Sequence, residues 1–292
     1  MQVANKQIEV IRITENGCDD ELDWIAIEEP LEIRLEYGVT DNRSIRNVAV
    51  TMRTPGNDAE LAAGFLFTEG IVKSRQQIEN VDYCFIACAD NKTNVIQVNL
   101  KPDAVPNLAN ADRNFYTTSS CGVCGKGSIA AIRTVSTFSS PDNNLKIPAE
   151  LLYQLPDTLK AQQEVFKVTG GLHASALFDL EGKVLLVKED VGRHNALDKL
   201  IGAALNSQLL PLNNSILLLS GRASFELVQK AAMAGIQIIA SVGAPSSLAV
   251  ELAEEFGITL AGFLRGNRFN IYTAPQRITI NSSQDNYQLQ NE

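Results

Sequence analysis

The chain has 292 residues, of which 45% are hydrophobic and 20% are charged, and its formal net charge is −9 at pH 7. This length allows two domains or one large domain, and the composition is typical of a folded soluble protein and excludes a disordered one. The acidic balance argues against bulk nucleic-acid binding, which depends on basic patches, but it permits one anionic ligand in a local basic pocket.

The termini and the cysteines indicate the compartment. Residues 1–6 lack the features of a signal peptide. The sequence also contains no apolar run of about 18 residues, the length that a membrane helix needs. Five cysteines make an odd number, so we expect reduced thiols and no disulfide framework. Together these features predict a cytoplasmic protein without a membrane segment.

The first part of the chain, residues 1–113, is predicted to form a β-rich N-terminal domain. Alternation of apolar and polar residues predicts strands over 8–13, 31–37 and 47–52, and a hairpin over 81–87 and 94–100. Asn57 and Glu60 resemble a capping box at the start of a helix that runs to Gly70. Residues 101–113 contain Pro102 and Pro106 without periodicity and are the candidate linker.

The second part, residues 114–292, is predicted to be an α/β domain. Strands and helices alternate, with expected strands over 174–180, 183–188, 215–219, 236–241 and 258–263, and expected helices over 148–160, 193–205, 223–234 and 246–256. Two successive β-α-β units predict a mostly parallel mixed sheet covered by helices.

The stretch Thr118–Ser128 places two cysteines, Cys121 and Cys124, two residues apart between a short β-like run and a helix that begins near Ile129. A thiol at a helix N-terminus has a lowered pKa, because the unpaired N–H groups there favour the nucleophilic thiolate. Lys126 adds to this positive field. The motif therefore predicts thiolate chemistry, and redox exchange, metal ligation and sulfur transfer all remain open.

Two enzyme classes are excluded by their missing residues. A P-loop nucleotide hydrolase needs a glycine where this chain has Ser120, and a Ser or Thr where it has Gly127. A zinc nucleoside deaminase needs a glutamate two residues after its third ligand, and the segment starting at His173 lacks it.

Three alternatives remain. A four-cysteine zinc site would combine Cys121 and Cys124 with Cys84 and Cys88, but the latter two lie in an expected strand and favour simple packing. A thiol–disulfide oxidoreductase would use the same cysteine pair. A non-catalytic cofactor-binding or chaperone module for a partner enzyme is the third.

Four polar clusters occur at turns of the second part, namely residues 169–173, 189–195, 220–222 and 265–268. Ligands of open α/β sheets bind at the carboxyl ends of the strands, so such clusters can converge on one pocket. The third cluster joins a strand to a helix N-terminus, which is a natural phosphate site. Its Arg222, like the arginines of the other clusters, suits bidentate contacts with phosphate or guanine.

The assembled motifs resemble the formate dehydrogenase accessory sulfurtransferase family (FdhD type). The resemblance covers roughly residues 28–277 and rests on the segments 64–71, 118–125, 169–174, 189–199, 222–230, 262–263 and 272–277. It implies a cytidine-deaminase-like three-layer α/β/α fold for the second part, and it makes a homodimer plausible.

The resemblance also implies a function. Such a protein accepts sulfur from a cysteine desulfurase as a persulfide and delivers it to the bis-guanine-dinucleotide molybdenum cofactor that formate dehydrogenase requires. Carried onto this chain, Cys121 is the persulfide carrier and Cys124 its helper, with no structural metal. The cofactor-binding residues would be Phe263, Leu264, Arg265, Gly266, Asn267 and Arg268, together with Arg222 and His194.

Overall fold

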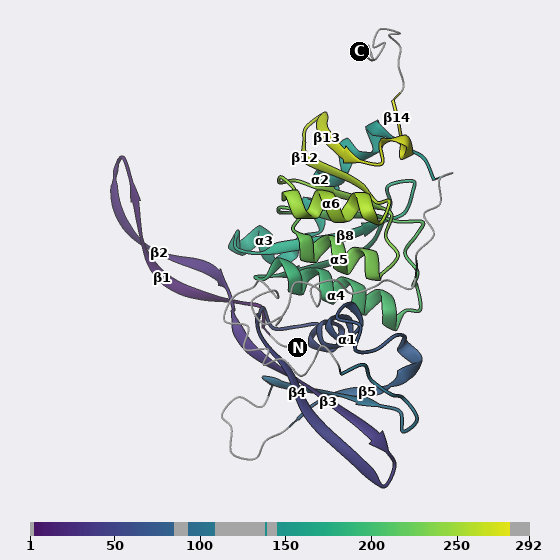
Figure 1. Cartoon of the computed structure of the whole chain (residues 1–292). Helices are drawn as coiled ribbons and strands as arrows, with labels where there is room; N and C mark the ends of the chain where they lie inside the picture. The colour runs from purple at the N-terminus through teal and green to yellow at the C-terminus, as the bar shows by residue number, and fades with distance from the viewer. Residues whose placement is uncertain (1–2, 85–92, 109–137, 139–144, 281–292) are drawn as a thin grey trace.

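The structure is a computed structural model and describes residues 3–84, 93–108, 138 and 145–280. The expected helix beginning near Ile129 and the expected boundary at 113–114 lie outside these residues. Figure 1 shows a two-stranded arm, a small sheet below and a larger helix-covered sheet above.

The arm is an antiparallel hairpin of β1 (Asn5–Thr14) and β2 (Gly17–Ala26), paired in register from Asn5↔Ala26 to Thr14↔Gly17. It projects away from the rest of the molecule in Figure 1. The first strand was predicted. The second was not, because its sequence GCDDELDWIA is acidic and offers little β-propensity.

The N-terminal sheet has four strands in the order β4-β3-β6-β5. Its strands are β3 (Glu29–Val39), β4 (Asn42–Arg53), β5 (Ile78–Tyr83) and β6 (Val95–Leu100). The predicted strands and the predicted antiparallel β5–β6 pair are confirmed. Alternate residues of β3, Leu31, Ile33 and Leu35, are fully buried and give the sheet its apolar face.

Helix α1 (Asp58–Thr68) covers this apolar face. The helix was predicted, but the capping box was wrong: Asn57 adopts a left-handed conformation (φ 58°) and its side chain caps no N–H group. The expected cap fails because a capping side chain acts from an extended backbone. A short 3-10 turn, Arg75–Gln77, then leads into β5.

The second sheet has six strands in the order β13-β12-β11-β10-β8-β9. They are β8 (His173–Phe178), β9 (Val184–Asp190), β10 (Ile216–Leu219), β11 (Ile238–Ser241), β12 (Thr259–Arg265) and β13 (Arg268–Thr273). The predicted β-α-β units are confirmed as β10-α5-β11-α6-β12, whose strands pair in parallel.

The sheet is mixed, but fewer of its neighbouring strand pairs are parallel than predicted. Only β10–β11 and β11–β12 are parallel, whereas β8–β9, β8–β10 and β12–β13 are antiparallel. The difference arises because hairpins flank the β-α-β units on both sides. Strands β9, β10, β11 and β12 nevertheless run in one direction, which sets the position of the candidate site.

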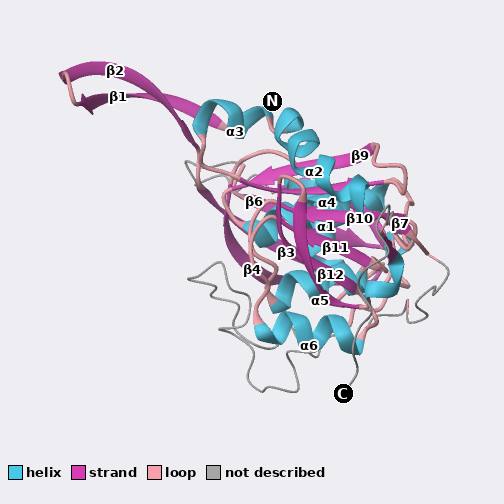
Figure 2. Cartoon of the chain, turned by 90° about the horizontal axis from the view of Figure 1, so that it is seen from above, coloured by secondary structure: helices cyan, strands magenta, loops and turns pink. Residues whose placement is uncertain are grey.

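Helices cover both faces of this sheet (Figure 2). One face packs against α4 (Arg193–Asn206), α5 (Phe225–Met233) and α6 (Ser247–Glu255). The other packs against α2 (Ala149–Gln162), beside the short β7–β14 pair (Ile147–Pro148 and Ile278–Thr279). The short helix α3 (Glu164–Thr169) precedes β8, and a 3-10 turn, Pro275–Arg277, precedes β14.

The two sheets are joined by the crossing of α1 over α4. Gly64 and Gly202 lie at the crossing, where a Cβ on Gly64 would lie 1.9 Å from the carbonyl oxygen of Asp198 and one on Gly202 would lie 1.9 Å from that of Glu60. Only glycine permits two helix backbones to approach this closely. The core cluster that contains α1 therefore continues from Leu31 in the first sheet to Leu260 in the second.

Candidate functional site

Strands β9, β10, β11 and β12 run in one direction, so their carboxyl ends lie together at one end of the six-stranded sheet, which is called the edge below. Strand β8 begins at this edge, because it runs antiparallel to β9 and β10. Helices α4, α5 and α6 follow β9, β10 and β11, so they begin at the same edge. The fold thus brings the polar clusters at 169–173, 189–195 and 220–222 to the carboxyl ends of the strands, where α/β proteins bind ligands, and it places the fourth, 265–268, at the carboxyl end of β12.

The two histidines of the chain both lie in this region. His173 pairs with Asp190 across β8 and β9, and a Cβ on Gly221 would lie 3.3 Å from its Nδ1 atom. His194, in the first turn of α4, places its Nε2 atom 3.4 Å from the Ser224 hydroxyl and 3.7 Å from a Glu226 carboxylate oxygen. The start of α4 is therefore linked to the start of α5.

The pKa of His173 is lowered from its ordinary value of 6.5, first by burial and then by the nearby Arg193 and His194, while Asp190 acts in the opposite direction. A lowered pKa keeps the imidazole neutral near pH 7. His173 therefore offers this edge a hydrogen-bonding group and not a cation.

Arg222 and Phe263 lie on either side of Gly243. The Gly243 N–H donates to the Gly221 carbonyl (2.9 Å), and a Cβ on Gly243 would lie 3.0 Å from Arg222 Cγ. The Phe263 N–H donates to the Gly243 carbonyl (3.0 Å). Phe263 has a left-handed backbone (φ 56°) and a 42% exposed side chain. A bulky residue in this strained conformation is uncommon and is often found at ligand sites.

The remaining residues of the predicted cofactor segment are divided between core and surface. The side chain of Leu264 is fully buried in the core beneath α2, so only its backbone is available to a ligand. Arg265 and Arg268 face each other across the end of the β12–β13 hairpin, and both are exposed, as are Gly266 and Asn267 at the turn. The hairpin end is thus a basic tip beyond the sheet edge.

Helices α4 and α5 begin at this edge with no side-chain cap within the described residues, whereas Ser246 caps α6 by accepting from the Ala249 N–H. Uncapped first turns offer N–H donors and partial positive charge. Beside them, the buried Arg193 Nε and His194 Nδ1 atoms have no hydrogen-bond partner in the described part of the chain. This combination suits an anionic group.

The predicted catalytic cysteines, Cys121 and Cys124, lie outside the described residues, as does Cys88. Cys84 is half-buried and its thiol donates to Gln97 Oε1 (3.3 Å). Among the described residues, no cluster of three His, Cys, Asp or Glu side chains is arranged to hold a metal ion. In the same part of the chain, no helix has the length and apolarity to cross a membrane.

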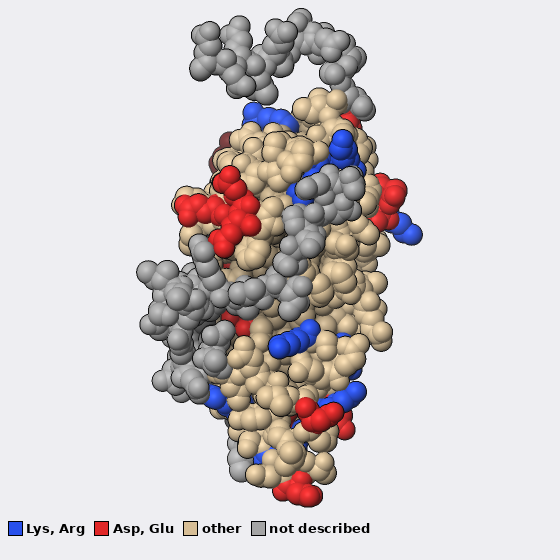
Figure 3. Space-filling view, turned by 45° about the vertical axis from the view of Figure 1, so that its right-hand side comes forward, with Lys and Arg blue, Asp and Glu red and all other residues tan. Residues whose placement is uncertain are grey.

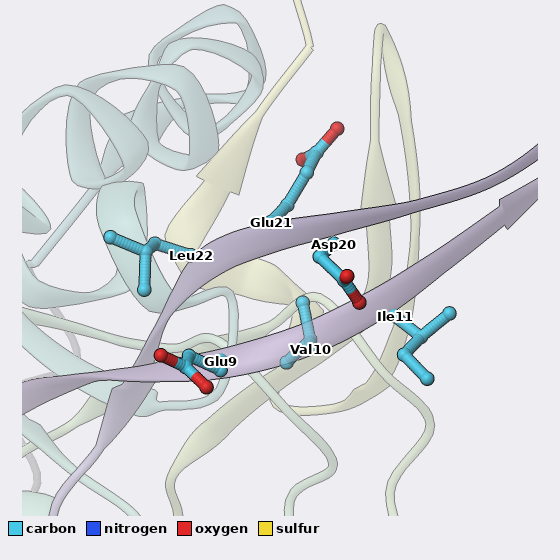
Figure 4. Close-up of a pocket in the computed structure, with 6 residues that line it drawn as sticks. All are labelled: Glu9, Val10, Ile11, Asp20, Glu21 and Leu22. Atoms are coloured by element: carbon cyan, nitrogen blue, oxygen red, sulfur yellow. The ribbon is translucent and has the colours of Figure 1, made fainter.

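A hollow of about 560 Å³ lies far from this edge, on the arm. Glu9, Val10, Ile11, Asp20, Glu21 and Leu22 line it, and Figure 4 shows that all six belong to the two strands of one ribbon. A single ribbon provides no enclosing wall, so the hollow does not have the concave, buried shape of a ligand site. On the face of the whole molecule that Figure 3 shows, acidic and basic side chains are both scattered.

Comparison with known proteins identifies the family. The sequence model of the FdhD/NarQ family matches residues 26–279. A protein of Streptomyces avermitilis named "Sulfur carrier protein FdhD" is 50% identical over 277 residues, which cover 94% of this chain and 95% of that relative. The chain therefore belongs to the FdhD/NarQ family.

More distant members of the FdhD/NarQ family also match over nearly the whole chain. A Sulfolobus acidocaldarius protein of the same name is 40% identical over 275 residues, covering 94% of this chain and 99% of the relative. A crystal structure from Desulfotalea psychrophila, of a protein provisionally described as a formate dehydrogenase accessory protein, superposes with a TM-score of 0.70. It is 26% identical and covers 95% of this chain and all (100%) of that one, so this chain shares its mixed α/β architecture with that protein.

Sequence reasoning placed His173 in a polar cluster but not among the cofactor-binding residues, and it left Ser224 and Glu226 out, although all three lie at the edge where His194 and Arg222 lie. Ser224 and Glu226 belong to a family motif, and His173 belongs to another. The proximity of these motifs to polar turns was the available signal.

Proposed function

We propose that this protein is a sulfurtransferase. It accepts sulfur from a cysteine desulfurase as a persulfide on Cys121 and delivers it to the bis-guanine-dinucleotide molybdenum cofactor that formate dehydrogenase requires. The observation that carries the proposal is a Cys-Gly-Val-Cys motif, residues 121–124, in a chain 50% identical to a named sulfur carrier protein.

The chemistry of the motif supports this role. The Cys121 thiolate attacks the terminal sulfur of the donor persulfide, so the carrier gains one sulfur and the donor cysteine leaves as a thiolate. In delivery, the cofactor as acceptor would supply the electron pair for the new bond to the outer sulfur, the S–S bond would break, and Cys121 would leave again as a thiolate. A thiol of lowered pKa is suited to both steps, because it is ionised for attack and leaves readily. Cys124 assists as the neighbouring thiol.

The edge of the six-stranded sheet suits the cofactor as substrate. Its diphosphate groups would lie against the uncapped starts of α4 and α5, near His194 and Arg222, and the exposed Arg265 and Arg268 would contact phosphate or guanine. Phe263 and the backbone of 264–267 would complete the contact. No resident metal is needed for these contacts.

Three further parts of the proposal concern the setting. The helices on both faces of the mixed sheet support a cytidine-deaminase-like fold for the second half. We place the protein in the cytoplasm, where thiols stay reduced. Its partners are the desulfurase and formate dehydrogenase, and a homodimer is the expected assembly.

Intact mass spectrometry after incubation with a cysteine desulfurase and cysteine tests the sulfur-carrying step. We expect the protein to gain the mass of one sulfur atom, and Cys121→Ala to lose this gain. Cys18→Ala is the matched control, because Cys18 is an exposed thiol on the arm and should leave the gain unchanged.

The same measurement distinguishes the alternatives. A thiol–disulfide oxidoreductase would lose two hydrogens as Cys121 and Cys124 join, and a non-catalytic chaperone would gain no sulfur. In cells, Cys121→Ala should abolish activation of formate dehydrogenase. A fully active formate dehydrogenase produced with this variant would refute the persulfide assignment.

A further inference from the structure

The carboxylate of Asp190 is a buried junction between the two sheets. Asp190 is fully buried at the end of β9 and accepts hydrogen bonds from the backbone N–H groups of Thr54 (3.2 Å) and Gly192 (2.8 Å). It also accepts from Asn195 Nδ2 (3.2 Å) and lies 2.7 Å from Lys199 Nζ. One side chain thus holds the last residues of β4 against the first turn of α4.

Further hydrogen bonds strengthen the same junction. Asn195 Nδ2 also donates to the Met52 carbonyl (2.7 Å), and the Thr51 hydroxyl donates to Asn195 Oδ1 (3.1 Å). Lys199 donates to the Thr54 carbonyl (2.8 Å). The end of β4 and the start of α4 are therefore fixed relative to each other by the hydrogen bonds of Asp190 and of its two side-chain partners, Asn195 and Lys199.

Stability alone does not account for this arrangement. A buried ion pair contributes little net stability, since removing both charges from water offsets their attraction. Burial raises the pKa of Asp190, while Lys199 beside it acts in the opposite direction. The residues that this junction holds are Arg193 and His194, each with a buried nitrogen that has no partner among the described residues.

Unpaired buried donors or acceptors are costly and persist where the surrounding structure fixes them. Asp190 also lies opposite His173 in the β8–β9 register, and it ends the strand that leads into α4, where His194 lies. We propose that Asp190 is a positioning residue: it holds the first turn of α4 so that His194 and Arg193 are directed to the anionic, nucleotide part of the substrate. This inference rests on the proposed cofactor site.

The test compares two buried aspartates, Asp190 and Asp198, each of which forms an ion pair with a buried lysine. Asp190→Asn removes the charge at the junction. Asp198→Asn removes the charge of Asp198, which is also buried and pairs with Lys230 (2.9 Å) but lies within α4, away from the edge. Both variants should lose stability, because each removes the nearest carboxylate from a buried lysine, although Lys230 keeps Glu69 as a second partner (3.3 Å).

GDP, which carries the guanine, ribose and diphosphate of the cofactor, is the probe for calorimetric titration of the full chain. We expect Asp190→Asn to weaken the Kd about tenfold, as the loss of one hydrogen bond to a charged group would. Asp198→Asn should change the Kd by less than about twofold. In a background that carries both Arg193→Ala and His194→Ala, Asp190→Asn should produce no further loss.

Imidazole NMR signals supply a readout that a purely structural role would not change. The chain has two histidines, so two sets of signals are expected. Asp190→Asn should move both sets and should lower the pKa of His173, because Asp190 raises it. Asp198→Asn should move neither set.

If Asp190→Asn does not fold, Asn195→Ala removes three of the junction's hydrogen bonds and leaves the Asp190–Lys199 ion pair in place, and a smaller but parallel weakening of GDP binding is expected. Equal weakening by Asp190→Asn and Asp198→Asn, or unchanged binding by a folded Asp190→Asn, would overturn the positioning role alone. A wild-type chain that does not bind GDP would overturn both this role and the proposed cofactor site. Persulfide loading of Cys121 is measured separately and is expected in every variant here.

Discussion

Lys230 lies in a buried group of charges where α1, α4 and α5 meet. Its Nζ atom is 2.9 Å from an Asp198 oxygen, 3.3 Å from a Glu69 oxygen and 2.9 Å from the Thr68 hydroxyl. It also lies 5.4 Å from the centre of the Phe65 ring. Burial by itself would lower the pKa of Lys230, but Asp198 and Glu69 outweigh burial and raise it above its ordinary value of 10.5.

The raised pKa predicts how stability changes in alkali. A group whose folded pKa exceeds its unfolded pKa contributes fully below the unfolded value, about 10.4 for lysine, and loses its contribution as the pH rises through the folded value. We expect the difference in unfolding free energy between wild type and Lys230→Met to stay constant from pH 8 to 10 and to shrink above. Urea denaturation across this range measures it, and a difference that grows with pH would contradict the explanation.

At the scale of elements, the crossing of α1 and α4 depends on Gly64. An added Cβ would lie 1.9 Å from the Asp198 carbonyl oxygen and 2.8 Å from the Gly202 nitrogen, and backbone atoms of a helix cannot move aside separately. Gly64→Ala should therefore destabilise the protein by about 3 kcal/mol, because overpacking outweighs the roughly 1 kcal/mol that alanine gains in a helix.

Urea denaturation of Gly64→Ala and Gly171→Ala checks this prediction. A Cβ on Gly171 would meet its nearest neighbour, the Thr169 carbonyl oxygen, at 3.7 Å, which is an ordinary contact. We expect Gly171→Ala to change stability by less than about 0.5 kcal/mol. Equal effects of the two substitutions would show that the close approach of α1 and α4 has no energetic importance.

The elements differ in how far the sequence predicts them. The apolar runs of β10 and β11 and the periodic stripe of α4 were sufficient, because burial on a central sheet leaves a clear local pattern. The second strand of the arm was missed, because its acidic residues show no apolar alternation that would predict its pairing with β1. The failed cap at Asn57 reflects a backbone conformation that no residue pattern revealed.

The candidate site was predictable in outline for a similar reason. His194 and Arg222 each follow a strand of one sheet, and strand direction places them at one edge. The bond between Thr54 and Asp190 joins residues 136 positions apart, and neither has a periodic or motif partner that predicts the contact. Leu264 was predicted to bind the cofactor, but alternation along β12 directs its side chain into the core.

For the whole molecule, the arm and the body should differ in local stability. Neither core cluster of the described residues includes a buried residue before Leu31, while Ile11, Ile13, Leu22 and Trp24 of the arm are exposed. These four side chains share one face of the arm, because side chains alternate along a strand and paired residues point to the same face. In the β1–β2 register, Leu22 is paired with Glu9 and Trp24 with Gln7, which lie two and four residues before Ile11. A two-stranded hairpin is marginally stable by itself in water.

Hydrogen exchange of the intact chain tests this difference. We expect amides of β1 and β2 to exchange with opening free energies of roughly 0–2 kcal/mol, and amides of β10 and β11 to exchange only with global unfolding. Protection of the arm equal to that of β10 would contradict this expectation and would show that the arm is covered in solution, for instance by a second copy of the chain.

The shared core has a consequence for dissecting the protein. A cut between β6 and β7 would leave one fragment with the apolar side of α1 uncovered and the other with the matching side of α4 uncovered. Neither piece would be a self-sufficient reagent for assigning sulfur loading or nucleotide capture. Mixed in equal amounts, however, the fragments should reassociate through the Gly64–Gly202 contact, so that recovery of activity would report on the assembly of this one helix pair.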